Sequence, residues 1–151
     1  MPPDVVAGVT VFLDYPGTRL DLPGTGNASS VLARVTNLTG VTGVFSVGDQ
    51  DADSDGFDDR LGVGLISSGT AVAPGDFARV VFDCLPGAAR PEAADFGCTP
   101  DVSTFFGNTI SATCAVTSVE VSPAAANAAR QMPSNQRLAG SSAAAPRSQR
   151  R

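Results

Sequence analysis

The sequence predicts an all-β protein, most economically a two-sheet antiparallel sandwich. Short runs of β-branched and aromatic residues recur along the chain, each bounded by Gly, Pro, Asn or Asp. Residues 77–84 alternate in polarity, as in a sheet with one wet side. Their apolar face holds Ala78, Val80, Phe82 and Cys84, and their charged face Arg79 and Asp83. No segment before Pro123 has a helical apolar period.

The predicted strands follow one another with clear boundaries. They span residues 9–15, 31–36, 41–47, 61–66, 77–84, 102–106, and 109–121 as one long or two short strands. The first ends at Pro16-Gly17, and the strand 102–106 turns at Gly107-Asn108. Between 109 and 121 the apolar parity shifts, which indicates a bulge or a break.

Composition divides the chain in two. The 151 residues suffice for one domain with a substantial core, which we expect at residues 1–122. Residues 123–151 hold one Leu, one Met and no Val, Ile or aromatic residue, so we expect a disordered C-terminal tail there.

Charge divides the chain at the same place. Residues 1–122 carry fifteen acids and five arginines, a net charge of −10, which disfavours nucleic-acid binding by the domain. The tail carries five arginines and no acid, which is a weak signal for an anionic partner; an extension without a role explains it better. No apolar run approaches the length of a membrane span, and Met1-Pro2-Pro3-Asp4 does not have the features of a signal peptide.

Residues 49–59 place six carboxylates around one glycine. The core of this acidic loop reads D-x-D-x-D-G-x-x-D, formed by Asp51, Asp53, Asp55, Gly56 and Asp59. A hard cation such as Ca²⁺ takes six to eight oxygens, and alternate side chains of a curling loop can point at one centre while glycine permits the sharp turn. We therefore predict a calcium site. Its expected ligands are Asp51, Asp53, Asp55 and Asp59, the carbonyl of Phe57, and Asp49 and Asp58 as auxiliary ligands.

The loop is not an EF-hand, because Gly62 stands where the bidentate Glu would be and no helix-forming sequence flanks it. Its spacing resembles the calcium loops of thrombospondin type 3 repeats. The alternative is a solvated acidic turn, since Asp and Gly favour turns on conformational grounds. Mutual repulsion of so many close charges favours the cation.

Three cysteines, Cys84, Cys98 and Cys114, predict one disulfide with one thiol left over. Cys98 is the expected participant because it lies between the other two; its partner is either Cys84, closing a short loop, or Cys114, closing the hairpin at Gly107-Asn108. In a β-rich chain with a calcium loop, the cysteines favour an oxidising compartment. The chain has no C-x-x-C pair and no His, so a zinc site is not expected.

Several segments together resemble a known family. They read GVTVFLDYPGTRLDLPG, then the acidic loop followed by DDRLGVGLI, then APGDFARVVFDC, DFGC and GNTISATCAV. The most telling are Leu13 to Pro16, where many relatives have Y-D-P, and the strand from Gly75 to Phe82. Over residues 5–121 they resemble the cohesin-type domains of secreted bacterial proteins, which share a jelly-roll sandwich with a family of carbohydrate-binding modules.

The resemblance implies a non-catalytic, calcium-stabilised module, extracellular or on the cell surface, that attaches to a protein partner, for which a dockerin-like domain is one candidate. The alternative is a carbohydrate-binding module of the same architecture, with a polysaccharide as partner. Cohesin-type domains usually open with two further strands, so the N-terminus is expected to be truncated. Strands left without these neighbours would expose their edges, and we expect self-association through residues 77–84 or the terminal strand.

Catalysis is not expected. The chain has no His to act as a base and no Lys, and no imidazole is available to activate a cysteine. The two glutamates lie far from the acidic loop in sequence, at Glu92 and Glu120. A sugar-binding aromatic row is also poorly supported, since the chain has no Trp and one Tyr, and Phe57, Phe105 and Phe106 are the only candidates for such a row.

Overall fold

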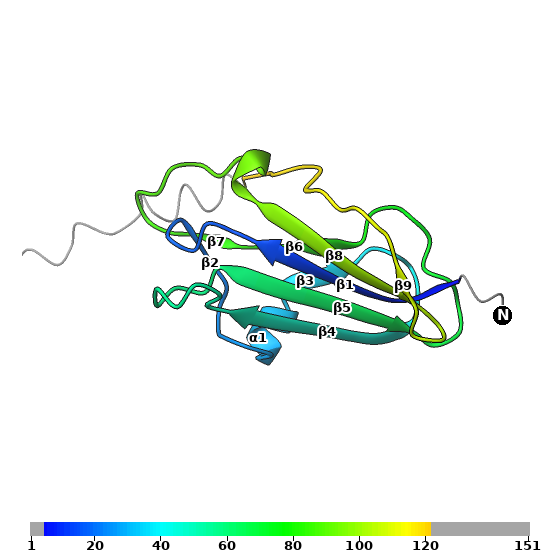
Figure 1. The fold of residues 1–151 in the computed structure, drawn as a ribbon. Helices are drawn as coiled ribbons and strands as arrows, with labels where there is room; N and C mark the ends of the chain where they lie inside the picture. Colours follow the sequence, from blue (N-terminus) through cyan, green and yellow to red (C-terminus); the bar gives the residue numbers. More distant parts are fainter. Residues whose placement is uncertain (1–4, 122–151) are drawn as a thin grey trace, which may run out of the picture. The chain divides into compact units, whose positions relative to one another are not determined.

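The computed structural model describes residues 5–121 and confirms an all-β fold. Within this range the strands are β1 (Val6–Asp14), β2 (Leu20–Asp21), β3 (Val35–Asn37), β4 (Gly43–Gln50), β5 (Arg60–Ser67), β6 (Ala78–Val80), β7 (Asp83–Cys84), β8 (Gly97–Thr104) and β9 (Thr109–Ile110). A one-turn helix, α1 (Ser29–Leu32), and a 3₁₀ turn, η1 (Ala93–Asp95), lie between strands. Figure 1 shows these elements arranged in two layers.

The front layer in Figure 1 is a five-stranded antiparallel sheet in the order β4-β5-β1-β8-β9. Its central register sets Val11 opposite Val63 on β5 and opposite Pro100 on β8. Side chains alternate along β5, where Leu61, Val63 and Leu65 are buried while Gly62 and Gly64 lie on the outward face. One face of this sheet therefore covers the core and the other is open.

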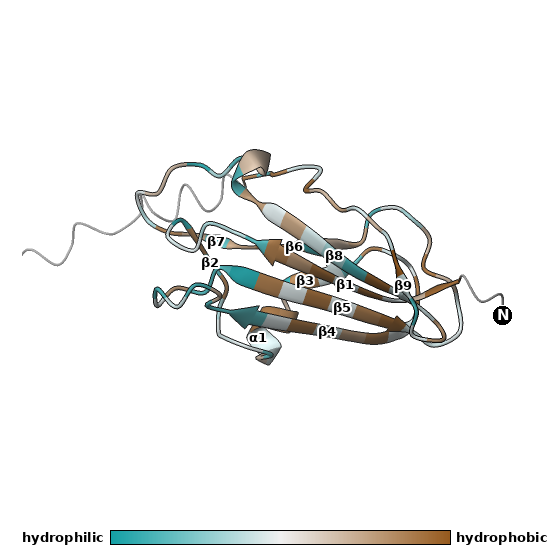
Figure 2. Ribbon diagram, in the orientation of Figure 1, coloured by the Kyte–Doolittle hydropathy of each residue, from teal (hydrophilic) through white to brown (hydrophobic). Residues whose placement is uncertain are grey.

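The second layer is narrower. The segment 77–85 runs along it and pairs with β3 through β6 and with β2 through β7. Leu20, Val31 and Val35 from this side pack against Leu61 and Val63 of the large sheet in one apolar core. Figure 2 shows hydrophobic residues concentrated along β1 and β5, the strands at the centre of this packing.

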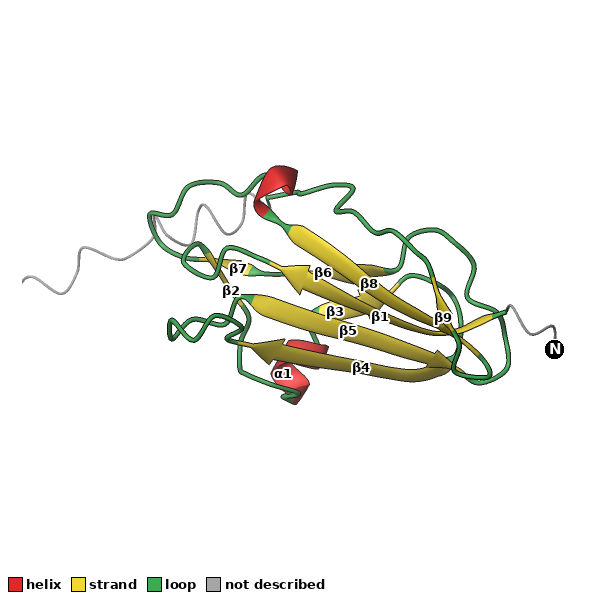
Figure 3. Ribbon diagram, viewed as in Figure 1, coloured by secondary structure: helices red, strands yellow, loops and turns green. Residues whose placement is uncertain are grey.

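Several strand predictions need correction (Figure 3). Val31 and Leu32 belong to α1, so the strand predicted at 31–36 begins only at Val35. The strand predicted at 77–84 is interrupted at Val81 and Phe82, although the alternation holds apart from Cys84, which is exposed. The short strand β2 was not predicted. The other differences are of length: β4 extends to Gln50, β8 begins at Gly97 and stops before Phe105, and residues 111–121 form no strand.

Cys98 and Cys114 form a disulfide, with a Cα–Cα distance of 5.8 Å. The expected participation of Cys98 is confirmed. Of its two possible partners the structure selects Cys114, and Cys84 remains a free, exposed thiol. The bridge ties β8 to the segment that follows β9. This segment, residues 111–121, forms no strand, so strand pairing does not hold it to the sheet.

Across residues 5–121, no helix has the length and apolarity that crossing a membrane requires. The tail predicted at 123–151 lies outside the described residues, and so do the first four residues.

Candidate metal centre

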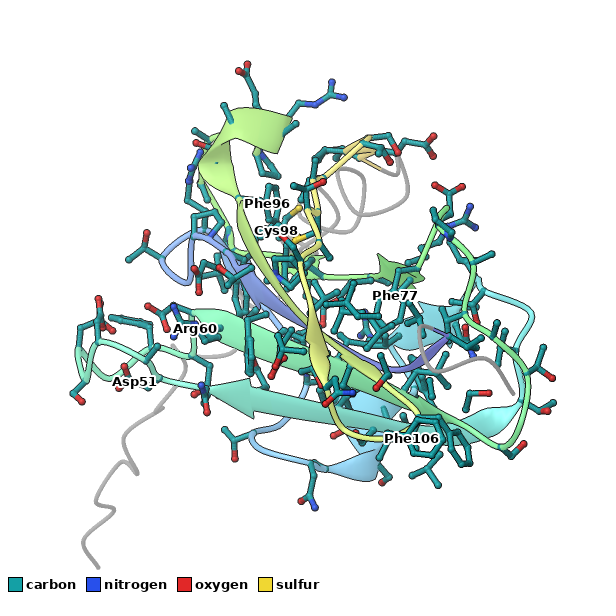
Figure 4. All side chains as sticks on the ribbon, turned by 45° about the vertical axis from the view of Figure 1, so that its right-hand side comes forward. Asp51, Arg60, Phe77, Phe96, Cys98 and Phe106 are labelled. Carbon is teal, nitrogen blue, oxygen red and sulfur yellow. A yellow bond between two sulfur atoms is a disulfide. The ribbon has the colours of Figure 1, made fainter. Side chains whose placement is uncertain are left out.

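The acidic loop joins the end of β4 to the start of β5. Its stem is closed by backbone hydrogen bonds: the amide of Asp59 donates to the carbonyl of Gln50 at 3.0 Å, and the amide of Tyr15 donates to the carbonyl of Asp59 at 2.8 Å. Gly17 lies directly against this stem, where a Cβ would be 2.4 Å from the carbonyl oxygen of Asp58. The loop is thus anchored to the turn that follows β1. In Figure 4 it projects beyond the sheet, with Asp51 at the end opposite to Phe106.

Three carboxylates converge at the tip of the loop. Asp51, Asp53 and Asp55 each offer one oxygen, and these oxygens all lie within 4.8 Å of one another. Oxygen atoms of carboxylates are the ligands that Ca²⁺ prefers. This convergence agrees with the alternate spacing on which the calcium prediction rests, because side chains at every second position of the curled loop point inward.

Backbone amides hold these carboxylates in place. Asp51 accepts hydrogen bonds from the amides of Ser54 at 2.6 Å and Gly56 at 2.8 Å. Asp53 and Asp55 each accept one from the amide two residues further on. Such tight curling requires left-handed backbone at Ser54 (φ 65°) and Gly56 (φ 94°), and glycine adopts this conformation without strain.

The electrostatics of the tip differ from one carboxylate to the next. The amide of Gly56 is the main cause that lowers the pKa of Asp51. The pKa of Asp53 is raised on balance: the hydrogen bond from the amide of Asp55 lowers it, but desolvation and the charges of Asp55, Asp59 and Asp51 outweigh that bond. A cation bound among these groups would relieve their mutual repulsion.

Asp49 is the first residue of the acidic loop, lies in β4 and is buried. Its side chain is only 3% exposed, Oδ1 accepts a hydrogen bond from the hydroxyl of Tyr15 at 2.8 Å, and Oδ2 has no hydrogen-bond partner in residues 5–121. Burial raises its pKa to about 6; the Tyr15 hydrogen bond opposes this, and the charges of Asp58 and Asp21 add to it. A buried carboxylate oxygen without a hydrogen-bond partner lowers the stability of the fold. Binding a proton or a cation at this atom would therefore be favourable.

The other predicted ligands are more scattered. Asp59 accepts a hydrogen bond from the amide of Ala52 at 2.8 Å, which closes the loop. Asp58 is half-buried, and its pKa is raised by burial first and then by Asp51, Asp21 and Asp59. The side chain of Phe57 is exposed. Of the seven predicted ligands, the structure thus gathers three in one group, Asp51, Asp53 and Asp55.

Sequence reasoning missed Asp21. This β2 residue acts electrostatically on Asp49 and Asp58, although it is far from them in the chain. The loop motif carries no signal for it, because the proximity arises where the segment that follows β2 meets the end of β4. The isolated bridge between Gly26 and Asp49 brings these segments together.

A second feature is the outward face of the five-stranded sheet. Exposed apolar side chains occur where Val44 pairs with Ile66, which are 67% and 64% exposed. Beside them is a shallow depression of about 370 Å³ above Gly8 and Gly64. Its polar lining includes Thr10, Ser46, Asp101, Ser103 and Thr109.

Comparisons of the chain with protein-family models, with curated proteins and with solved structures found no match. The resemblance to cohesin-type domains therefore stays a prediction from the sequence motifs.

Proposed function

We propose that this chain is a non-catalytic, calcium-stabilised β-sandwich module that attaches to a protein partner outside the cell. The convergence of Asp51, Asp53 and Asp55 in a glycine-turned loop carries the calcium part of the proposal. Calcium supplies the positive charge that this cluster lacks, since Arg60, the next residue after the loop, pairs with Asp14 instead.

Isothermal titration calorimetry of the calcium-free chain tests this part. We expect saturable Ca²⁺ binding by the wild type and a loss of affinity of roughly tenfold or more in Asp53→Asn, which removes a charged ligand. Asp76→Asn is the matched control, because Asp76 is an exposed acid outside the loop. Absence of heat with the wild type, or equal effects of the two substitutions, would refute the site.

The outward face of the large sheet supports attachment to a protein. Its outward positions pair Val44 with Ile66 and Ser46 with Gly64, so small, polar and aliphatic side chains make up this face. Phe12 is the aromatic residue among the outward positions of β1, β4, β5 and β8. A face with exposed aliphatic groups suits a protein surface, whereas sugar rings stack on aromatic rows.

The polar lining of the depression above Gly8 and Gly64 favours the second candidate, a carbohydrate-binding module, because hydroxyl and carboxylate groups can hydrogen-bond sugar hydroxyls. Phe105 and Phe106 do not supply a stacking platform, since their rings are inclined at 83° to each other.

Two binding assays separate the candidates. A protein-attachment module stays in the supernatant with insoluble cellulose and chitin. It also retains a protein from the secreted fraction of its source, and loses that protein on Ile66→Asp but not on Leu38→Asp, an exposed control. Depletion onto a polysaccharide, abolished by Asp101→Ala in the depression, would establish the alternative.

A further inference from the structure

The segment 77–85 is paired along one edge only. On that edge, Val81 donates its amide hydrogen to the carbonyl of Arg34, Leu38 donates to the carbonyl of Phe77, and Leu85 donates to the carbonyl of Arg19. In each of these three hydrogen bonds, the residue that belongs to segment 77–85 is odd-numbered. Backbone groups of successive residues in an extended strand point to opposite sides, so β3 and β2 occupy the same edge.

The opposite edge presents the backbone groups of the even-numbered residues. These residues are Ala78, Val80, Phe82 and Cys84. Within residues 5–121, no strand pairs with this edge and no backbone hydrogen bond reaches it. The terminal segment 111–121, expected from the sequence to offer another such edge, forms no strand. Unpaired edge groups of this kind are ready to accept another strand.

We propose that this edge pairs with the same edge of a second copy of the chain, antiparallel, about a two-fold axis at Val81. In that register Val80 faces Phe82 of the other copy, and Ala78 faces Cys84. Both pairs join even-numbered residues, whose backbone groups point outward, so the ladder has the hydrogen-bonding parity that an antiparallel pair requires.

Charge selects this register. Arg79 lies two residues before Val81 and Asp83 two residues after it, so the two-fold axis sets Arg79 of each copy opposite Asp83 of the other. Arg79 is exposed and forms no ion pair with the residues that the structure describes. Asp83 already accepts hydrogen bonds from Arg34 at 2.9 and 3.0 Å, and its carboxylate retains lone pairs for a second guanidinium. Opposite charges directly across an antiparallel pair stabilise it, and like charges destabilise it.

Apolar contact favours the same pairing. Val81 is 49% exposed and would meet Val81 of the other copy on the outer face. On the inner face, Val80 and Phe82 are only partly buried at the margin of the core. A two-fold interface uses one surface twice, so every contact is made in duplicate.

Cross-linking tests the register. Val81→Cys in a Cys84→Ser background is expected to give a disulfide-linked dimer on mild oxidation, because residues directly opposite in such a pair lie about 4.5 Å apart at Cα, within reach of a disulfide. Val44→Cys in the same background is the matched control, since Val44 is also exposed but lies on another edge strand, β4. A cross-linked dimer of the Val44→Cys variant, with none of the Val81→Cys variant, would overturn the proposal.

Charge reversal tests the pairing in solution. Sedimentation equilibrium is expected to show a dimer whose dissociation constant rises roughly tenfold or more on Arg79→Glu, which sets two acids opposite each other at both ends. Arg90→Glu makes the same change at an exposed loop position and should leave the constant unchanged. A chain that stays monomeric overturns the proposal. This includes the case in which residues outside 5–121 of the same chain occupy the edge. The same measurement is made with Ca²⁺ and with chelator. Because the edge does not involve the acidic loop, the dissociation constant of the dimer should be the same in both, whether or not the loop binds calcium.

Discussion

Tyr15 donates its hydroxyl hydrogen to Oδ1 of Asp49 at 2.8 Å, and this bond links the end of β1 to the end of β4 inside the core. Both side chains are buried, and Asp49 is the first residue of the acidic loop. Burial first, and then Asp49, raise the pKa of Tyr15 well above its usual range, so the phenol stays a donor. The position of the loop stem therefore depends on a polar contact within an apolar core.

Removing the hydroxyl of Tyr15 should lower the free energy of unfolding. Tyr15→Phe leaves the Asp49 carboxylate without its hydrogen-bond donor, and a buried acceptor without a partner costs about 1–3 kcal/mol. We expect the free energy of unfolding to fall by this amount in urea titrations with chelator present. A change well below this range would show that water reaches Asp49.

The burial of Asp49 predicts an unusual pH dependence in calcium-free protein. Because its pKa is raised to about 6 in the folded state, the folded chain binds this proton more tightly than the unfolded chain does. The corresponding stability is fully present below the unfolded pKa, near 4, and is lost as pH rises through about 6. Relative to Asp49→Asn, the wild type should lose up to about 3 kcal/mol across this window. Parallel pH curves for the two proteins would contradict the assignment.

The Cys98–Cys114 disulfide should contribute more to the free energy of unfolding than the free thiol of Cys84 does. Replacing Cys98 and Cys114 together by Ser removes a cross-link at a sequence separation of 16 and should lower stability by about 3 kcal/mol. Cys84→Ser is the control and should be nearly neutral, because Cys84 is exposed and unbridged. Urea unfolding of the three proteins under non-reducing conditions checks this prediction.

Gly17 should couple the turn after β1 to the acidic loop. In Gly17→Ala the new Cβ meets the backbone oxygen of Asp58, which cannot rotate away, so the loop stem must shift at a cost of about 1–3 kcal/mol. We also expect weaker calcium binding. Gly48→Ala is the control, since a Cβ there meets nothing within 4 Å. Equal stability of the two variants in urea would show that the stem adjusts freely.

Much of the fold could be predicted because alternation is a local signal. Leu61, Val63 and Leu65 alternate with small residues, and β5 forms where that pattern occurs. The acidic loop was also recognisable, since the spacing of Asp51, Asp53 and Asp55 is contained in a few residues.

The rest depends on partners that a local pattern does not reveal. Helix α1 is one turn long, too short to show an apolar period. Residues 111–121 are rich in Val and Thr, yet no neighbouring strand pairs with them in the part of the chain that the structure describes, so β propensity alone did not produce a strand. Asp21 contributes to the environment of Asp49 through packing between distant segments, which spacing within the loop could not indicate.

Thermal unfolding with excess Ca²⁺ and with chelator tests the central claim most directly. Binding to the native state alone adds about 2.7 kcal/mol at a hundredfold excess over Kd, which corresponds to a rise in Tm of roughly 10 °C for a domain of this size. We expect this rise in the wild type and about half of it or less in Asp53→Asn, because its affinity for Ca²⁺ is expected to be roughly tenfold lower or weaker still. An identical Tm with Ca²⁺ and with chelator would show that residues 49–59 are an acidic turn without a metal.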